Sequence, residues 1–199
     1  MAKWLVIGIS GATCSGKTSL AKELASKFKN SLCIHQDDYF LAQDDPRHIE
    51  VPELKHYNWE IVTSLDMEKM HSDILKITKS SSLEDTEQTP KIRILIIDGF
   101  IIFNYKPICD LCDLRYFLTL TKDQCWGRRK HRKYDPPDVP DYFERVVWPE
   151  YIKHKAEILG NKDLCDSITF LDGTENQKIV FDRVFSEIVK TGEKYISYN

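Results

Sequence analysis

The sequence contains no apolar run long enough to cross a membrane. Its longest apolar stretch, residues 92–103, is interrupted by Arg93 and Asp98, whereas a membrane-spanning helix needs about 20 apolar residues. Residues 1–9 are too short, and wrongly flanked, for a secretory signal, and neither end carries a lipidation motif. We therefore expect a cytoplasmic protein that has no membrane partner.

A strong net charge is also absent. Lys and Arg number 28 and Asp and Glu number 31, which gives a formal net charge of −3, whereas a general nucleic-acid binder needs a broad basic surface. A hydrophobic fraction of 42% argues against a disordered chain. Because a chain of this length can bury a sufficient core, we expect one monomeric domain over residues 1–199 with no nucleic-acid partner.

Cysteines are few, and their pattern does not indicate disulfides or zinc. Without a secretory signal, the 6 Cys residues are expected to be reduced thiols. Cys109 and Cys112 have the spacing of a metal-binding pair, but a zinc site also needs a second pair. Cys125, His131 and Cys165 do not supply a regular one. We therefore interpret these cysteines as ordinary buried or surface thiols.

Short apolar runs alternate with helical patterns along the chain. Leu20, Leu24 and Phe28 recur at four-residue intervals, which is typical of one helix face. Strands separated by helices need crossover connections, and these produce a parallel sheet covered on both faces. We predict an α/β fold with a parallel sheet of about five strands flanked by helices. The predicted strands are residues 4–9, 32–34, 92–97, 116–120 and 168–171, and the predicted helices include residues 18–28, 67–77 and 181–188.

Three local patterns complete this prediction. Residues 80–89 are polar and precede a proline, so we predict an exposed loop. Residues 133–140 contain three prolines, which predicts an extended or mobile segment. Thr174 and Gln177 have the spacing of a capping box ahead of the last helix.

A phosphate-binding motif occupies residues 11–18. The segment Gly11-Ala12-Thr13-Cys14-Ser15-Gly16-Lys17-Thr18 matches G-x-x-x-x-G-K-[ST] in full, between a predicted strand and a predicted helix. The glycines permit a turn whose N–H groups surround an anion, and the helix N-terminus adds positive potential. Lys17 is suited to bridge the β- and γ-phosphates of ATP, and the Thr18 hydroxyl is suited to bind Mg²⁺. The motif is typical of the P-loop NTPases.

Acidic residues follow two of the predicted strands. Asp98 ends the apolar strand Ile94–Ile97. In such a pattern the carboxylate supports a metal ion beside the phosphates. The same position also suits a carboxylate that caps the next turn. Asp37 and Asp38 follow the strand at residues 32–34. Only one of these two neighbours can face the γ-phosphate, and the other suits a helix cap. The one that faces the γ-phosphate is suited to accept a proton from the attacking hydroxyl.

A basic run, residues 128–133, precedes the proline-rich segment. In an enzyme that handles phosphate, such a run predicts a lid at about residues 128–140, whose arginines neutralise charge on the transferred group and whose closure excludes water. A nuclear signal or a solvated surface also fits the run taken alone. A nucleotide switch is the alternative class, but no Asn-Lys-x-Asp element is present, since Asn104–Pro107 does not match it.

Longer strings of residues carry a family resemblance over almost the whole chain. The chain resembles the nicotinamide riboside kinases, within the uridine kinase-like nucleoside kinases. Besides the phosphate loop, the strings are Gln36–Phe40, Met67–Met70, Asp98–Pro107, Tyr134–Asp138, Val147–Pro149 and Leu171–Thr174.

The resemblance implies transfer of the ATP γ-phosphate to the ribose 5′-hydroxyl of nicotinamide riboside, with nicotinic acid riboside as a second substrate. The product would be a mononucleotide that feeds NAD biosynthesis. A uridine or cytidine kinase remains the alternative within the family. ATP and Mg²⁺ are the implied cofactors, and a small riboside is the implied partner.

The resemblance also implies roles for individual positions. Asp37 and Lys17 correspond to the catalytic residues, and the magnesium site corresponds to Thr18, Asp37 and Asp98. Substrate contacts correspond to Asp37, Asp38, Tyr39, Phe40, Trp59, Glu60 and Arg129. ATP contacts correspond to Gly11, Ala12, Thr13, Cys14, Ser15, Gly16, Lys17, Thr18, Ser19, Arg128, Arg132, Lys133, Tyr134, Asp172, Gly173 and Thr174.

The chain departs from the family pattern at two places. Family members carry Glu at the position of Asp98, and Tyr-Asp at the positions of Trp59 and Glu60. A cationic pyridinium ring suits an aromatic surface, and the candidates for it are Tyr39, Phe40, Tyr57, Trp59 and Tyr134.

Overall fold

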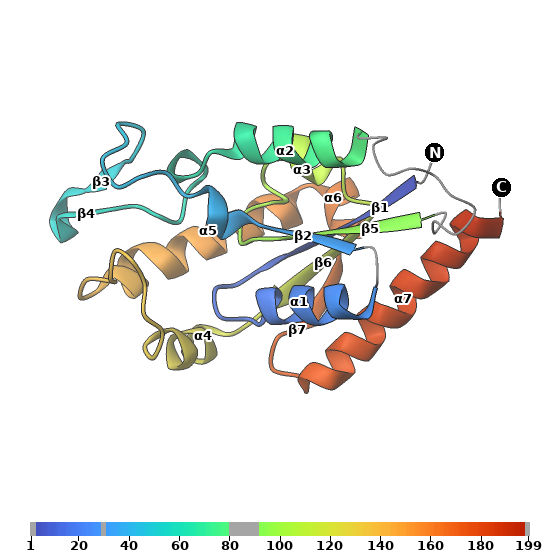
Figure 1. Ribbon diagram of the computed structural model, residues 1–199. Helices are drawn as coiled ribbons and strands as arrows, with labels where there is room; N and C mark the ends of the chain where they lie inside the picture. Colours follow the sequence, from blue (N-terminus) through green and yellow to red (C-terminus); the bar gives the residue numbers. More distant parts are fainter. Residues whose placement is uncertain (1–2, 29–30, 80–91, 198–199) are drawn as a thin grey trace.

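A five-stranded parallel sheet forms the centre of the protein (Figure 1). The computed structural model describes residues 3–28, 31–79 and 92–197, so the loop predicted at residues 80–89 lies outside the described residues. The strand order is β2-β5-β1-β6-β7, and all neighbouring strands in this sheet are parallel. The strands are β1 (Lys3–Gly11), β2 (Ser31–His35), β5 (Ile92–Asp98), β6 (Leu114–Thr119) and β7 (Thr169–Asp172).

Helices cover both faces of this sheet (Figure 1). On one face α1 and α7 pack against β1 and β5, and on the other α2, α3 and α5 cover the same strands. Because both faces of the sheet are buried, consecutive residues of its strands are apolar. The helices are α1 (Lys17–Lys27), α2 (Met67–Lys79), α3 (Lys106–Cys109), α4 (Lys122–Arg129), α5 (Trp148–Gly160), α6 (Lys162–Asp166) and α7 (Gln177–Ser197).

The predicted α/β fold with about five parallel strands is confirmed, and the predicted strands all exist, with no end shifted by more than two residues. The capping box at Thr174 is wrong. The Thr174 hydroxyl donates to Asp172 at 2.7 Å, and Asn176 instead accepts the N–H of Lys178 at 2.9 Å. Thr121 and Gln124 form a capping box at the start of α4.

A small arm, residues 41–60, extends beyond the sheet edge where β2 ends (Figure 1). It contains the two-residue antiparallel strands β3 (Glu50–Val51) and β4 (His56–Tyr57). Its base is fixed by two contacts to the α5 side of the molecule, from Trp59 N–H to the Tyr142 hydroxyl at 2.9 Å and from Asn58 to Glu150 at 3.0 Å. Strands this short leave no period-two pattern, so the sequence did not predict them.

None of the helices within the described ranges is both long and apolar enough to cross a bilayer.

Candidate active site

The phosphate loop joins the end of β1 to the start of α1 (Figure 1). Gly11 and Gly16 have φ values of +130° and +98°, which glycine adopts without the penalty that other residues incur. A Cβ on Gly11 would lie 2.1 Å from the carbonyl oxygen of Leu118. Ala12 donates its N–H to that same carbonyl at 3.0 Å. A loop fixed in this way ahead of a helix N-terminus is suited to bind phosphate groups.

Two polar side chains of the loop fit a phosphate ligand. The Lys17 ammonium donates to the Ala12 carbonyl at 2.7 Å. Burial lowers the pKa of Lys17, although the carboxylates of Asp37 and Asp98 oppose the shift. The Ser15 hydroxyl is buried and has no hydrogen-bond partner among the described residues. A buried polar group without a partner is costly, and a phosphate oxygen would accept its hydrogen bond.

The carboxylate of Asp98 lies beside the phosphate loop at the end of β5. One of its oxygens accepts a hydrogen bond from the Thr18 hydroxyl at 2.7 Å, and the other pairs with Nδ1 of His35. Asp98 is buried, and the exposed carboxylate of Asp37 lines the same cavity. Thr18, Asp37 and Asp98 together offer the hard oxygen donors that Mg²⁺ prefers, so the donor set fits this ion.

A cavity of about 430 Å³ runs from the phosphate loop to the arm. It is large enough for a riboside, since small-molecule sites start at about 300 Å³. Of the predicted site residues, it brings together Thr13, Cys14, Lys17, Thr18, Asp37, Phe40, Trp59, Glu60, Asp98, Arg129, Arg132 and Tyr134.

Three aromatic rings, of Phe40, Trp59 and Phe100, also line the cavity. Phe40 stacks on Phe100 with ring centroids 6.1 Å apart and meets Trp59 edge to face at 5.9 Å. The Trp59 indole N–H is buried without a hydrogen-bond partner in the described part of the chain. Aromatic faces bind cationic rings, so this part of the cavity wall can receive a pyridinium.

Asp38 and Tyr39 are two predicted substrate contacts that lie outside the cavity. The Tyr39 hydroxyl donates to Asp73 at 3.4 Å and its ring packs under the Lys69 ammonium at 5.0 Å, so this side chain points to α2. The reason is local: residues 36–39 form a single helical turn, and successive residues of such a turn point in different directions.

Arg129 connects the phosphate loop, the segment predicted to be a lid and Glu60 at the base of the arm. Its side chain is 4% exposed. It forms a bidentate pair with Asp138 at 2.7 and 2.9 Å, a pair with Glu60 at 3.2 Å and a hydrogen bond to the Thr13 hydroxyl at 3.1 Å. Its guanidinium lies 4.2 Å from the ring centre of Tyr134. Burial raises the pKa of Glu60, and the charge of Arg129 opposes that shift.

The rest of the predicted lid is irregular in structure, as its three prolines indicated. Tyr134 and Arg132 line the cavity, and the Tyr134 hydroxyl lies 3.3 Å from the Thr13 hydroxyl. Lys133 is exposed and does not line the cavity. The structure therefore brings two of these three predicted ATP contacts to the phosphate loop.

A smaller hollow of about 70 Å³ lies behind the phosphate loop, against the turn that leads into α7. Ser15, Gly16, Ser19 and Gly173 line it, as does Arg128. The Arg128 guanidinium bridges the loop and the turn, donating at 3.0 Å to the Cys14 carbonyl and at 3.0 Å to the Gly173 carbonyl. Asp172 and Thr174 hydrogen-bond to each other beside this hollow.

The sequence interpretation missed three residues of the site. His35 is the register partner of Asp98 on the neighbouring strand, and this pairing could have been deduced once the order of strands was known. Asp138 had no sequence signal as the partner of Arg129, because the two are joined only by the path of the lid. Phe100 follows Asp98 and Gly99 at the strand end, where side chains near the ligand are expected.

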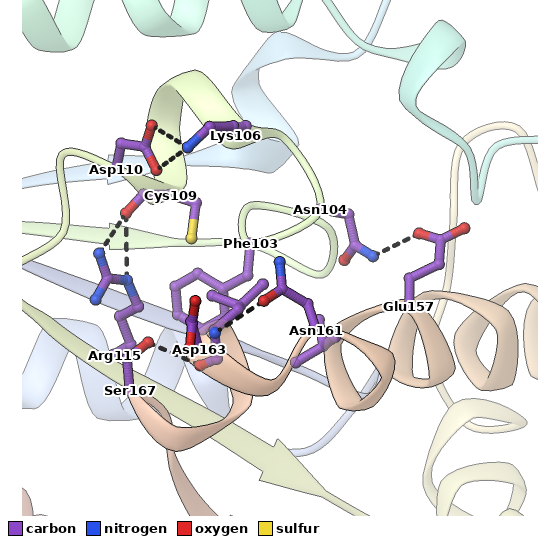
Figure 2. Close-up of a pocket in the computed structure, with 12 residues that line it drawn as sticks. Phe103, Asn104, Lys106, Cys109, Asp110, Arg115, Glu157, Asn161, Asp163 and Ser167 are labelled. Atoms are coloured by element: carbon purple, nitrogen blue, oxygen red, sulfur yellow. Dashed lines mark hydrogen bonds and ion pairs between the residues drawn. The ribbon is translucent and has the colours of Figure 1, made fainter.

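A second, larger cavity of about 540 Å³ lies away from the phosphate loop, between α3 and α6 (Figure 2). Most of its polar groups are already engaged within its wall: Lys106 pairs with Asp110 at 2.7 Å, and Asn104 donates to Glu157 at 2.8 Å. Arg115 donates to the Cys109 carbonyl. No phosphate-loop residue lines this cavity, so it is not the site of the predicted chemistry.

Comparisons with known proteins show the family of the chain. A family model described as an AAA domain matches residues 7–160. Nicotinamide riboside kinase 1 from Homo sapiens is 38% identical over 192 residues, which cover 94% of this chain and 94% of that protein. Nicotinamide riboside kinase 2 from Homo sapiens is 35% identical and covers 92% of this chain and 80% of that protein.

Among solved structures, a possible uridine kinase from Bacillus stearothermophilus superposes with a TM-score of 0.54 at 17% identity, over 86% of this chain and 90% of that chain. At this identity the likeness concerns the fold alone, and it agrees with the parallel sheet. The family itself follows from the sequence relatives, whose identity extends over nearly the whole chain. The chain belongs to the nicotinamide riboside kinase family.

Proposed function

We propose that this protein transfers the γ-phosphate of ATP to the ribose 5′-hydroxyl of nicotinamide riboside, giving the mononucleotide that feeds NAD biosynthesis. The observation that carries the proposal is one cavity of about 430 Å³ that both phosphate-loop residues and stacked aromatic rings line. The sequence relatives named nicotinamide riboside kinases support the same conclusion. We extend the proposal to nicotinic acid riboside as a second substrate.

In the proposed reaction, Asp37 accepts the proton of the 5′-hydroxyl as its oxygen attacks the γ-phosphorus. One phosphorus–oxygen bond forms and the bond to the β-phosphate breaks, so that ADP leaves. Lys17, the loop N–H groups and Arg132 stabilise the charge on the transferred group. Mg²⁺, when held by Thr18, Asp37 and Asp98, supplies further neutralisation of phosphate charge.

The cavity wall around the aromatic rings has a chemistry that suits a cationic base. Phe40, Trp59 and Phe100 offer ring faces to a pyridinium. Glu60 and Asp138 add carboxylates that Arg129 holds in place. Carboxylates are good acceptors for ribose hydroxyls, and this region therefore supports recognition of the sugar as well as the base.

We further propose that residues 1–199 act as one monomeric kinase domain in the cytoplasm, with residues 128–140 as its lid. The contacts of Arg129 and Tyr134 with Thr13 support this role, because they join the lid to the phosphate loop. Closure over bound substrates would exclude water, which otherwise competes as the phosphate acceptor.

A coupled kinase assay tests the proposal, with nicotinamide riboside, nicotinic acid riboside, uridine and cytidine as acceptors and product masses as the readout. We expect phosphorylated nicotinamide riboside in amounts equal to the ADP formed. Lys17→Ala is the control, because losing this cation should raise the barrier by at least about 3 kcal/mol. ATP hydrolysis that does not depend on an acceptor would favour a nucleotide switch, and exclusive use of uridine or cytidine would overturn the substrate assignment.

A further inference from the structure

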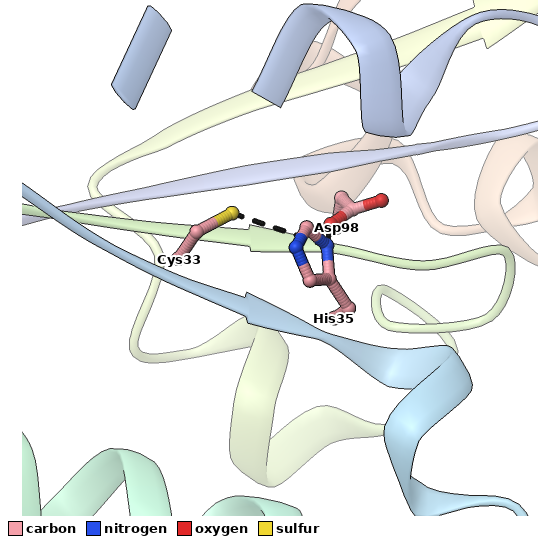
Figure 3. A group of neighbouring side chains, drawn as sticks. All are labelled: Cys33, His35 and Asp98. Carbon is pink, nitrogen blue, oxygen red and sulfur yellow. Dashed lines mark hydrogen bonds and ion pairs between the residues drawn. The ribbon is translucent and has the colours of Figure 1, made fainter. Parts of the chain in front are cut away.

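Three side chains of different chemistry converge where β2 meets β5 (Figure 3). Cys33 and His35 are two residues apart on β2 and therefore point to the same face of the sheet. Asp98 is the register partner of His35 on β5. The Cys33 sulfur lies 4.0 Å from Nδ1 of His35, that nitrogen contacts an Asp98 oxygen, and the three ligand atoms all lie within 4.8 Å of one another.

The cluster can be reached from solvent. β2 is an edge strand of the sheet, the His35 side chain is 25% exposed, and Cys33 is half-buried. Cys33 and His35 do not line the cavity that we assign to ATP and the riboside. The proposed reaction therefore gives no role to the thiol or the imidazole.

We propose that Cys33, His35 and Asp98 form a binding site for Zn²⁺, and that zinc bound there inhibits the kinase. Sulfur, imidazole nitrogen and carboxylate oxygen are the ligands that Zn²⁺ takes in proteins, with tetrahedral geometry and solvent in the fourth position. Mg²⁺ prefers oxygen ligands and does not compete well for sulfur and nitrogen. The donor set therefore separates this site from the magnesium site, although both include Asp98.

The geometry requires only small side-chain movements. Tetrahedral ligands at bond lengths of about 2.0–2.3 Å lie about 3.3–3.5 Å apart. The Cys33 sulfur would approach His35 by less than an ångström from its present 4.0 Å, and Nδ1 of His35 would separate from Asp98 to admit the ion. The metal replaces the Cys33 thiol proton, which is released to solvent, and binds the neutral imidazole through Nδ1.

Inhibition follows from the position of Asp98. Its other oxygen accepts the Thr18 hydroxyl at 2.7 Å, so the same carboxylate serves both sites. A divalent ion on Asp98 neutralises the charge that attracts Mg²⁺ and places a second positive charge next to it. Zinc is therefore expected to lower turnover in a way that added riboside does not reverse.

The binding test uses Co²⁺ as a spectroscopic probe on the full-length protein without nucleotide. We expect intense visible bands from tetrahedral cobalt, a sulfur-to-cobalt charge-transfer band in the near ultraviolet, and loss of both when Zn²⁺ is added at one equivalent. Cys33→Ser and Cys33→Ala should each weaken cobalt and zinc binding at least about tenfold. Cys165→Ser and Cys14→Ser are the matched controls and should retain the spectrum.

Activity provides a second readout, which rests on the proposed kinase reaction, whereas the spectrum does not. With Mg²⁺-ATP in excess, Zn²⁺ should inhibit the wild type and a chelator should restore it. Cys33→Ser should turn over normally without zinc and require at least about tenfold more zinc for equal inhibition. Equal zinc affinity in wild type and Cys33→Ser, a cobalt spectrum without the sulfur band, or bands lost only in Cys14→Ser would each overturn the proposal.

Discussion

The structure makes its sharpest energetic prediction at Arg129. Replacement by Met keeps much of the side-chain volume but removes the guanidinium that contacts Asp138, Glu60 and Thr13. Two carboxylates then face each other with no cation between them. We expect the variant to fold with clearly lower stability than the wild type.

The size of the effect can be worked out from the burial of the partners. Removing one member of a buried ion pair costs about 3–5 kcal/mol. The Asp138 side chain is 26% exposed and Glu60 is 13% exposed, so water partly solvates the orphaned carboxylates and we expect the lower end, about 3 kcal/mol. For a chain of this length that corresponds to about 6–12 °C in Tm. Arg129→Lys keeps the charge but loses the bidentate geometry, so it should cost less than Arg129→Met.

Urea unfolding without ligands, followed by circular dichroism, measures this loss. Because the pKa of Glu60 is raised in the folded protein, the folded state holds that proton longer than the unfolded chain. The stabilising contribution of protonated Glu60 is lost as pH rises through its folded pKa. Arg129→Met removes the charge that opposes this upward shift. The variant should therefore lose least stability in acid, where Glu60 is protonated, and should lose more stability as the pH rises. Adding Glu60→Gln to Arg129→Met should restore part of the lost stability. A loss below about 1 kcal/mol, typical of exposed ion pairs, would refute the reasoning.

Three other substitutions or labels test separate parts of the site. Asp37→Asn should retain ATP binding by calorimetry and lose phosphoryl transfer by at least about a hundredfold; retained transfer would move the base to another carboxylate such as Asp98. Gly11→Ala places a Cβ 2.1 Å from the Leu118 carbonyl oxygen at a φ of +130°. Thermal unfolding should therefore show a free energy of unfolding that is lower by at least about 2 kcal/mol, and a wild-type Tm would contradict the loop geometry. The Cys14 thiol lies in the phosphate loop and lines the cavity, so ATP should protect it from alkylation, measured by mass spectrometry; equal labelling with and without ATP would count against the assigned nucleotide position.

The sequence predicts the sheet and the phosphate loop because both depend on local patterns. Apolar runs such as Ile94–Ile97 and the complete motif at residues 11–18 carry their own signal. Asp98 was also predicted beside Thr18, since the carboxyl ends of parallel strands share one edge of the sheet. Predictions of this kind need the strand order only in outline.

Contacts that depend on the path of irregular segments were not predicted. The partner of Arg129 is Asp138, and only the course of the lid brings them together. The direction of Tyr39 depends on a single helical turn, which a strand-end pattern does not specify. His35 joins Asp98 through the register of two strands that are separated by more than fifty residues.

The arm at residues 41–60 has a consequence for how substrate range can change. Its tip, with β3 and β4, lies outside the main sheet (Figure 1), while Trp59 at its base lines the cavity. Exchange of residues 42–57 between homologues would leave the segments at residues 11–18 and 128–140 untouched. Such an exchange would alter the cavity wall at Ala42 and Gln43, while the ion pair between Glu60 and Arg129 still ties the base of the arm to the segment beside the phosphate loop.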